Sequence, residues 1–267
     1  MATLPADKVA QWKYDGFLSP FPLLNDEELH ACRQGVERYE TWLGSRINAH
    51  ADMKWRSMPY LLMPWAAKLA RDPRILDKVE DLVGPDILIF TSTFFIKEPH
   101  SPTIAAWHQD STYYGLEPKE EVTVWVALTE ASKAAGCMDA LSFRGKPRQL
   151  SHVSHVVEDS SPVAMPLEPG WFSMHHGLCP HRSGPNTSNH RRIGLGLNYI
   201  PTSVKPSGSI RQAALLVRGA DRYGHFEPAA WPKDELGEKE VATHERAMSL
   251  YRDAYLEEEA RHAKLSV

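Results

Sequence analysis

A histidine and an aspartate stand two positions apart in the segment 107–110, Trp-His-Gln-Asp, and this pair could bind a metal ion. Successive side chains of a β-strand point to opposite faces, so His108 and Asp110 would face one cavity while Gln109 points into the packing behind it. Two imidazoles and one carboxylate form the facial triad that holds non-haem iron(II). The pair therefore predicts an iron site whose second imidazole comes from a distant strand.

The second imidazole is expected from another polar segment, about seventy residues further along the chain. His181 is the candidate, although His175 and His176 stand in the same segment. Ser183 follows His181 by two positions and Arg192 follows it by eleven. A planar guanidinium binds a carboxylate through two hydrogen bonds, so an arginine here suits a dicarboxylate cosubstrate. The segment thus predicts a carboxylate-binding site beside the metal.

Both segments belong to a longer resemblance that runs from about residue 10 to about residue 227. The sequence resembles the phytanoyl-CoA dioxygenase family of non-haem iron(II), 2-oxoglutarate-dependent oxygenases. The matching stretches are FFIKE at 94–98, WHQDSTYY at 107–114, VTVWVALT at 122–129, GCM at 136–138, and HRSGPN at 181–186 with Arg192.

The resemblance implies that His108, Asp110 and His181 are the iron ligands. It favours His181 over the competing histidines because only His181 has Ser at +2 and Arg at +11, as the family does. Eleven residues after His175 and His176 stand an asparagine and a threonine instead. One of these two histidines is then expected to support the ligand strand from behind.

The resemblance also implies 2-oxoglutarate and dioxygen as cosubstrates. The C5 carboxylate of 2-oxoglutarate would pair with Arg192 and accept a hydrogen bond from Ser183, with Trp125 nearby. Thr93, on the cavity face of the strand predicted at 87–97, is assigned to the same site. The implied reaction is hydroxylation of a C–H bond of a small molecule, with release of succinate and CO2.

The carboxylate at position 110 narrows the reaction further. Relatives that chlorinate carry Ala or Gly at this position, which leaves room for chloride, so Asp110 predicts a hydroxylase and not a halogenase. Two other classes stay open: a jelly-roll protein that only binds its ligand, and a metal-dependent hydrolase that uses the same three ligands with zinc. Arg192 argues against the hydrolase, because hydrolysis has no need of a 2-oxoglutarate site.

Substrate-binding residues are expected close to the metal ligands. Tyr113 and Tyr114 follow the His-x-Asp pair, and Lys97 ends the strand predicted at 87–97, where it could meet an anionic group of substrate or cosubstrate. The chain departs from the family at 139–146, where relatives continue with a Pro-Gly-Ser-His turn, so no relative's substrate carries over. Residues 218–226 form either a lid over the pocket or a solvated turn.

The order of patterns along the chain predicts a single α+β domain over 1–267. Residues 1–85 carry helical periodicity and form a helical shell. Strand patterns then dominate 86–201, and their spacing favours a jelly roll, for which the resemblance implies a double-stranded β-helix. Residues 202–267 hold the possible lid segment and a charged C-terminal helix.

Composition limits the possible partners. The net charge of −4 gives no basic excess, so no nucleic-acid partner is expected. No apolar run approaches the length of a membrane span, and no signal peptide is recognised at the N-terminus. The three cysteines are widely spaced and lack a CxxC pair, which fits a reducing cytoplasm. We expect a cytoplasmic monomer or homodimer that acts on a small molecule.

Overall fold

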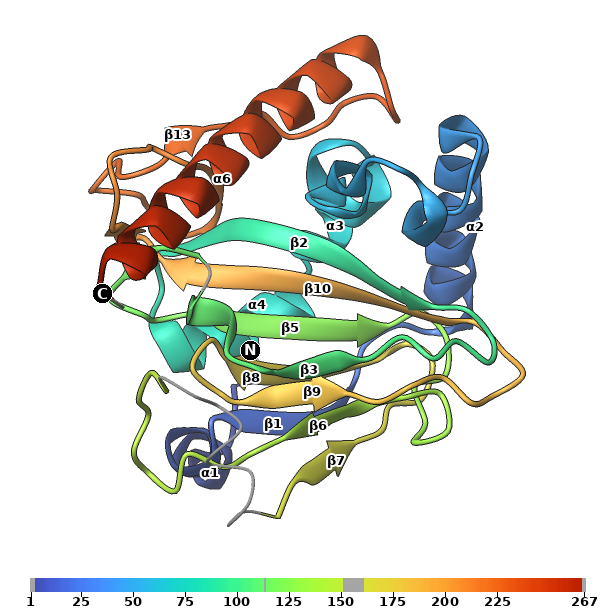
Figure 1. Cartoon of the computed structure of the whole chain (residues 1–267), viewed down its shortest axis with the longest axis horizontal. Coiled ribbons are helices and arrows are strands. Elements are labelled where there is room, and N and C mark those ends of the chain that lie inside the picture. Colours follow the sequence, from blue (N-terminus) through green and yellow to red (C-terminus); the bar gives the residue numbers. More distant parts are fainter. Residues whose placement is uncertain (1–2, 113, 151–160, 266–267) are drawn as a thin grey trace.

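A seven-stranded sheet forms the centre of the computed structural model, which describes residues 3–112, 114–150 and 161–265 (Figure 1). Its strands, in spatial order, are β1 (Phe17–Pro22), β8 (Trp171–His176), β5 (Val122–Ala127), β10 (Arg192–Pro201), β2 (Ile87–Lys97), β12 (Ala213–Arg218) and β13 (Glu227–Pro228). Neighbouring strands are antiparallel except for β12 and β13.

A smaller antiparallel sheet faces the cavity side of the major sheet. Its strands, in spatial order, are β3 (Ala105–His108), β9 (His181–Ser183), β6 (Met138–Ala140) and β7 (Val163–Met165). A further pair is formed by β4 (Leu116–Glu117) and β11 (Lys205–Pro206). The two facing sheets with flanking helices confirm the predicted α+β jelly-roll class.

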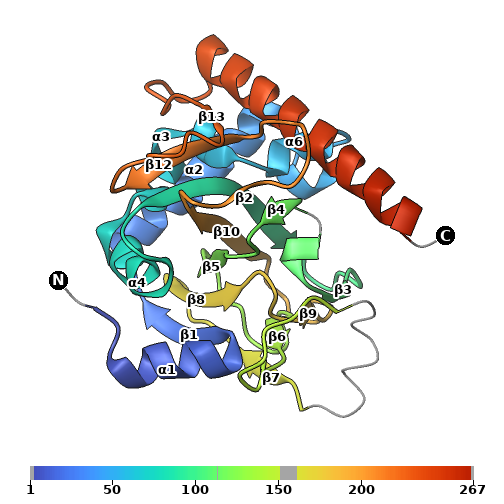
Figure 2. The same ribbon diagram turned by 90° about the vertical axis from the view of Figure 1, so that its left-hand side faces the viewer.

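Helices cover the other face of the major sheet and one of its ends (Figure 2). They are α1 (Ala6–Asp15), α2 (Asp26–Leu43), α3 (Pro64–Ala70), α4 (Pro73–Val83) and α6 (Glu238–Leu265), with 3-10 turns η1 (Ile47–Ala49), η2 (Met53–Arg56), η3 (Pro59–Leu61) and η4 (Asp110–Thr112). No helix in these described ranges has the length and apolarity that crossing a membrane requires.

The helix boundaries follow local chemistry. The α2 helix begins after Asn25, whose side chain accepts from the Glu28 amide at 2.9 Å, while the Glu28 carboxylate accepts from the Asn25 amide at 3.0 Å. This reciprocal capping satisfies two amides that the helix itself cannot pair. Residues 1–85 were predicted to form a helical shell, but they also contain the strand β1, which pairs with β8. Its two prolines are tolerated because β1 is an edge strand.

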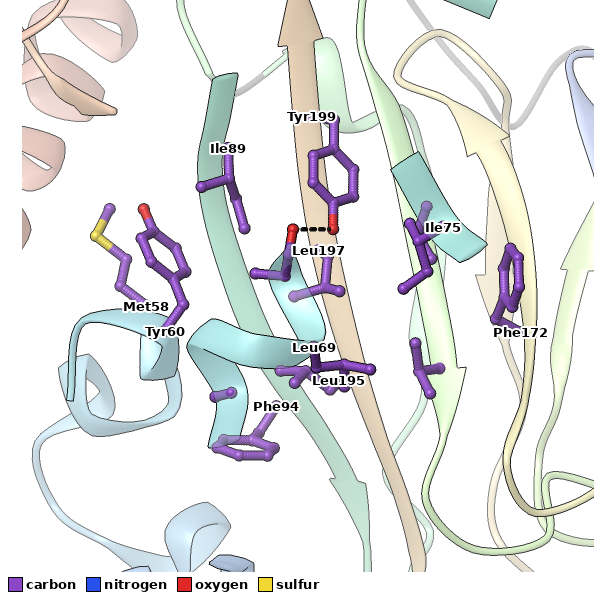
Figure 3. Close-up of a cluster of buried hydrophobic side chains, with 14 of the residues drawn as sticks. Met58, Tyr60, Leu69, Ile75, Ile89, Phe94, Phe172, Leu195, Leu197 and Tyr199 are labelled. Carbon is purple, nitrogen blue, oxygen red and sulfur yellow. Dashed lines mark hydrogen bonds between the residues drawn. The ribbon is translucent and has the colours of Figure 1, made fainter. Parts of the chain in front are cut away.

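The two faces of β10 divide the core from the cavity. Leu195, Leu197 and Tyr199 point toward the helices, and the Tyr199 hydroxyl donates to the carbonyl oxygen of Ala70 at 3.0 Å (Figure 3). Side chains of Arg192 and Asn198 line the cavity on the opposite face. All ten residues of β10 are buried. The helical layer therefore fixes the strand from behind, and the strand presents polar groups to the cavity.

Candidate active site

Three side chains of the predicted metal-binding type meet where β3 pairs with β9. His108 ends β3, His181 begins β9, and the two residues are opposite each other in the strand register. The Nε2 atoms of His108 and His181 lie 3.5 Å and 3.7 Å from Oδ1 of Asp110. One ligand atom from each residue lies within 4.8 Å of the others. Two imidazoles and one carboxylate at this spacing fit a divalent transition metal.

The sequence pattern predicted that His108 and Asp110 lie on one strand, and this prediction is wrong. The β3 strand ends at His108, and Asp110 opens the 3-10 turn η4. The predicted direction of Gln109 is nevertheless confirmed: its side-chain amide donates to the carbonyl oxygen of Leu178 at 2.5 Å, and its oxygen accepts from the Leu150 amide at 2.8 Å. These bonds hold the turn, so Asp110 faces the histidines.

Backbone carbonyls fix the orientation of both ligand-type imidazoles. The Nδ1 atom of His108 lies 2.8 Å from the carbonyl oxygen of Ala106, and that of His181 lies 2.9 Å from the carbonyl oxygen of Cys179. An Nδ1–H that donates to a carbonyl leaves Nε2 free to bind a metal. Burial lowers the pKa of His181 to about 3, so this imidazole is already neutral, as a metal ligand must be.

The second oxygen of Asp110 is held by the major sheet. Oδ2 lies 3.3 Å from Nε2 of His175 on β8 and accepts from the Thr123 hydroxyl at 3.2 Å. Burial would raise the pKa of Asp110, but the neighbouring imidazoles of His181, His108 and His175 hold it well below its usual range. The carboxylate is therefore ionised, with Oδ1 directed to the triad.

A buried acid, Glu121, extends this polar network behind Asp110. The Asn198 side-chain amide donates to Glu121 Oε1 at 2.7 Å and lies 2.8 Å from the Thr123 hydroxyl, which itself is 3.1 Å from Glu121. Burial, together with the charge of Asp110, raises the pKa of Glu121 to about 8. At neutral pH Glu121 is thus mostly protonated. Sequence reasoning missed Glu121 and Asn198, although Asn198 shares strand parity with Arg192.

Arg192, Lys97 and Ser183 form a second cluster, which we term the carboxylate clamp. Lys97 and Arg192 are opposite each other on β2 and β10, and both are buried. Lys97 Nζ lies 2.7 Å and Arg192 Nη1 lies 2.8 Å from the Ser183 hydroxyl oxygen. The Ser183 hydroxyl donates to the carbonyl oxygen of Gly136 at 2.9 Å, and Arg192 also donates to that oxygen. The structure thus places Lys97 with the predicted cosubstrate residues.

The carboxylate clamp has the electrostatics of an anion site. Among the described residues, no carboxylate pairs with either cation, and the buried Nε–H of Arg192 has no acceptor. Burial, with the charge of Arg192, lowers the pKa of Lys97 to about 8, and burial lowers the pKa of Arg192 to about 10. Two adjacent buried cations without a counter-ion are costly. A dicarboxylate such as 2-oxoglutarate fits this site, because its charge would offset both cations.

Trp125 lies on β5, the strand next to β10, and its ring is beside the carboxylate clamp. The Arg192 guanidinium carbon is 5.4 Å from the centroid of the Trp125 ring. Gly194 permits this contact, because a Cβ atom there would lie 1.9 Å from the ring. Thr93, predicted at the same site, is opposite Gly196 in the β2–β10 register and does not line the cavity.

The triad and the carboxylate clamp open into one cavity of about 410 Å³. Tyr114 lines it, with its hydroxyl 3.5 Å from the Asn198 amide nitrogen, whereas Tyr113 lies outside the described residues. Arg56 also lines the cavity, and sequence reasoning missed it because residues 44–60 carry no periodic pattern. The cavity can therefore hold a metal, a dicarboxylate and a second small molecule.

The possible lid segment lies elsewhere. None of residues 218–226 lines the cavity. Arg218 pairs with Asp77 at 2.7 Å, and Arg222 pairs with Asp86 at 2.6 Å. These ion pairs tie the segment to α4 and to the start of β2, so the structure favours a surface turn over a lid.

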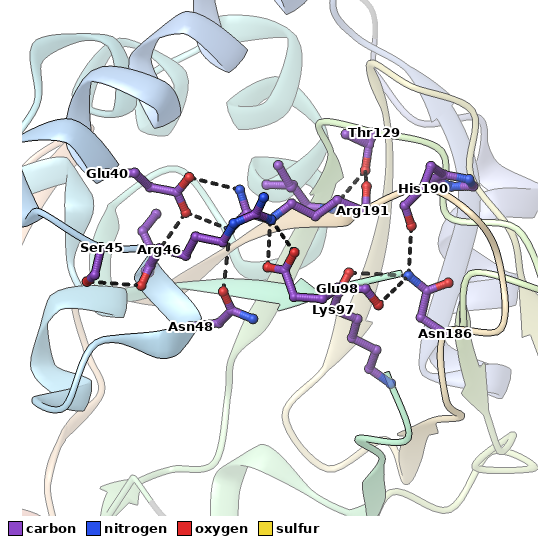
Figure 4. A network of polar contacts seen from close by, with 12 residues as sticks. Glu40, Ser45, Arg46, Asn48, Lys97, Glu98, Thr129, Asn186, His190 and Arg191 are labelled. Carbon is purple, nitrogen blue, oxygen red and sulfur yellow. Dashed lines mark hydrogen bonds and ion pairs between the residues drawn. The ribbon is translucent and has the colours of Figure 1, made fainter. Parts of the chain in front are cut away.

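An ion-pair network lies next to Lys97 of the carboxylate clamp (Figure 4). Arg191 pairs with Glu40 at 2.6 Å and with Glu98 at 2.8 Å, and Arg46 also pairs with Glu98. Figure 4 shows Lys97 pointing away from this network. Glu98 follows β2 and Arg191 precedes β10, and both face away from the cations next to them. Glu98 and Arg191 belong to a neutralised network, whereas the two cations of the carboxylate clamp have no carboxylate partner among the described residues.

The fold is a jelly roll, and its site carries the two-histidine, one-carboxylate ligand set of the non-haem iron class. The sequence model described as phytanoyl-CoA dioxygenase (PhyH) matches residues 12–194. The chain belongs to this family of iron(II)- and 2-oxoglutarate-dependent oxygenases, whose metal and cosubstrates are iron(II), 2-oxoglutarate and dioxygen.

Individual relatives agree with this membership. The chain is 26% identical over 185 residues to a protein of Stutzerimonas stutzeri named "Probable alpha-ketoglutarate-dependent hypophosphite dioxygenase", covering 63% of this chain and 61% of that protein. It is 27% identical over 144 residues to an ectoine dioxygenase of Bordetella parapertussis, covering 50% and 47%. The chain therefore spans less than two thirds of the length of these curated relatives.

A solved structure covers more of the chain. The non-heme monooxygenase ThoJ, in its apo form, superimposes with a TM-score of 0.83 at 26% identity, covering 95% of this chain and 99% of that chain. A nickel complex of ThoJ gives a TM-score of 0.80 at 27% identity, covering 94% and 99%. The likeness therefore extends over nearly the whole chain.

Proposed function

We propose that this protein is a 2-oxoglutarate-dependent dioxygenase that hydroxylates a C–H bond of a small molecule and releases succinate and CO2. One observation carries the proposal: the His108, Asp110 and His181 triad shares a cavity with two buried cations that have no carboxylate partner in the described part of the chain. The triad alone would suit several metals and reactions. The triad together with the carboxylate clamp suits a metal-dependent enzyme that uses a dicarboxylate cosubstrate.

The donor atoms suggest how the groups would be held. Iron(II) would bind Nε2 of His108, Nε2 of His181 and Oδ1 of Asp110, which are the atoms that converge. The C5 carboxylate of 2-oxoglutarate would be held by Arg192, Ser183 and Lys97. When bound, iron(II) with 2-oxoglutarate and dioxygen supplies the oxidation of the substrate C–H bond.

The protein's own contribution is positioning and exclusion of water. Thr123 and His175 hold Oδ2 of Asp110, which keeps Oδ1 directed to the triad. Trp125 covers the Arg192 guanidinium, so the charge on the carboxylate clamp acts in a medium of low polarity and binds an anion more strongly than in water. The carboxylate at position 110 fills the ligand place that a halide would need, which supports hydroxylation over halogenation.

Two alternatives from the sequence find less support. A protein that only binds a ligand would not need the triad and the clamp together in one cavity. A hydrolase would not need two buried cations beside Ser183. Neither alternative accounts for all the charged groups of the cavity.

The test is an anaerobic titration of the metal-free protein with iron(II) and then 2-oxoglutarate, followed by the visible charge-transfer band of the chelate. We expect the band in the unmutated protein and its loss in His181→Ala. His225→Ala is the matched control, because His225 packs against Tyr223 away from the cavity, and it should keep the band. A folded protein without the band would exclude the proposed function.

Compartment and assembly remain predictions. Cys32, Cys137 and Cys179 are all buried and free, which supports a reducing compartment such as the cytoplasm. For the oligomeric state we propose a monomer or a homodimer, and size-exclusion chromatography with light scattering would decide between them. A small molecule is the proposed partner, in keeping with the relatives named for hypophosphite and ectoine.

A further inference from the structure

Arg56 brings a further positive charge to the wall of the cavity. It ends the 3-10 turn η2 and lines the same cavity as the triad. Within residues 3–112, 114–150 and 161–265, no hydrogen bond or ion pair engages its guanidinium, and the ionisable side chain that influences it is Tyr251. A guanidinium stays charged at any physiological pH. Arg56 is an exposed residue, so both water and a ligand in the cavity can reach this charge.

The other charges of the cavity are already accounted for. Arg182 also lines the cavity, but it is neutralised by Asp139 at 3.0 Å. The two cations of the carboxylate clamp serve the cosubstrate in the proposed function. Asp110, the one carboxylate among the described residues of the lining, belongs to the triad. Among the described residues that line the cavity, Arg56 is thus the cation that neither a carboxylate of the chain nor the proposed cosubstrate offsets.

Arg56 is separate from the carboxylate clamp. The next residue, Ser57, pairs with Thr93 of β2, and Thr93 is opposite Gly196 in the β2–β10 register. Gly196 is four residues from Arg192 along β10, which corresponds to about 13 Å of extended strand. The backbone at Arg56 therefore lies beside the middle of β2, whereas the carboxylate clamp lies at the end of β2 and the start of β10.

Part of the cavity wall is apolar and exposed. Met53, Phe95 and Ile104 all line the cavity, and they are 47%, 44% and 62% exposed. Large apolar side chains that stay exposed inside a concave site commonly contact a ligand. A hydrophilic substrate would gain nothing from this surface, whereas an apolar one would bury it.

We propose that the substrate is a small molecule with an apolar body and one anionic group, such as a carboxylate. The anionic group pairs with Arg56, and the apolar body packs against Met53, Phe95 and Ile104, which brings a C–H bond of that body toward the triad. This inference rests on the proposed function, because it assumes that the carboxylate clamp is filled by 2-oxoglutarate.

The test measures binding of matched acids and amides to the protein loaded anaerobically with iron(II) and 2-oxoglutarate. The probes are octanoate with octanamide, and 4-phenylbutyrate with its amide, and calorimetry gives each dissociation constant. We expect at least one acid to bind about tenfold or more tightly than its amide, since a hydrogen bond to a charged group has about that strength. Arg56→Gln should abolish this preference, and Arg56→Lys should keep part of it.

Arg252→Gln is the matched control, because Arg252 is 70% exposed on α6 and does not line the cavity. It should keep the full preference for acids. Equal binding of acids and amides, no binding of any acid, or a preference that survives Arg56→Gln would overturn the inference while the chelate band stays intact. Absence of the band before any probe is added would instead overturn the proposed function, and with it this inference.

Discussion

Replacing Arg192 by methionine should separate the stability of the ligand-free protein from its affinity for 2-oxoglutarate. Arg192 is 5% exposed, and burial lowers its pKa to about 10, which means that the folded state disfavours the charge by roughly 3 kcal/mol. Methionine removes the charge and keeps an unbranched side chain. The hydrogen bonds lost to Ser183 and Gly136 stabilise by about 1 kcal/mol each. The ligand-free variant should therefore gain about 1 kcal/mol, or about 2–4 °C in Tm.

The effect on ligand binding should have the opposite sign. In the unmutated protein, 2-oxoglutarate at about a hundred times its Kd adds about 2.7 kcal/mol to the free energy of unfolding, which raises Tm by about 5–10 °C. Truncating one partner of a buried, charged hydrogen bond costs about 2–5 kcal/mol of affinity, which is about thirtyfold or more. Most of the Tm shift should then disappear in Arg192→Met at the same ligand concentration.

Differential scanning calorimetry of the manganese(II)-loaded protein, with and without 2-oxoglutarate, measures both quantities. Arg182→Met is the matched control, because Arg182 lines the same cavity but is 45% exposed and ion-paired with Asp139. Such exposed pairs contribute about 0–1 kcal/mol, so the control should keep the ligand-induced shift. A ligand-free Arg192→Met protein that melts more than about 5 °C lower, or one that keeps the full shift, would refute this reasoning.

Three further predictions concern the surroundings of the site. Because burial and Arg192 lower the pKa of Lys97 to about 8, binding of 2-oxoglutarate should weaken by up to about tenfold per pH unit above pH 8, and titrations of Lys97→Met should lack this dependence. The pKa of Glu121 in the folded state is about 8, above its ordinary value of about 4.3. Its stabilising contribution is therefore complete below about pH 4.3 and is lost as the pH rises through 8, so Glu121→Gln should show a flatter fall in Tm between about pH 5 and pH 8.5. Gly194→Ala would place a methyl group 1.9 Å from Trp125, and should weaken 2-oxoglutarate binding about tenfold in a fluorescence titration; unchanged binding would show that the ring is not needed there.

Much of the candidate site could be predicted because its residues are linked by short-range patterns. His108 and Asp110 are two positions apart, and Ser183 and Arg192 stand at fixed distances from His181. The α+β jelly-roll class was predictable for the same reason, since strand and helix patterns are local.

Other features depend on pairing between distant segments, which one sequence does not reveal. Strand parity placed Lys97 on the cavity face, but only the β2–β10 register puts it opposite Arg192. Arg56 reaches the cavity through tertiary packing, and no periodic pattern marks it. Glu121 shares the parity of Thr123 and Trp125, but only the packing of β5 against β10 brings it to Asn198. The strand assumed for Asp110 was wrong because the bonds of the Gln109 side chain turn the backbone directly after His108.

At the end of β2 and the start of β10, Lys97 and Arg192 face the cavity while Glu98 and Arg191 face the other way. This arrangement has a consequence for the entropy of binding a dicarboxylate. Lys97 and Arg192 carry long side chains that would lose about 2 kcal/mol of rotamer freedom each if binding alone ordered them. Here the outer neighbours, Glu98 and Arg191, fasten both strand ends, and Ser183 already engages both cations. The ordering is completed when the chain folds. A dicarboxylate then enters a preorganised site, and little of its interaction energy is spent on arranging the protein.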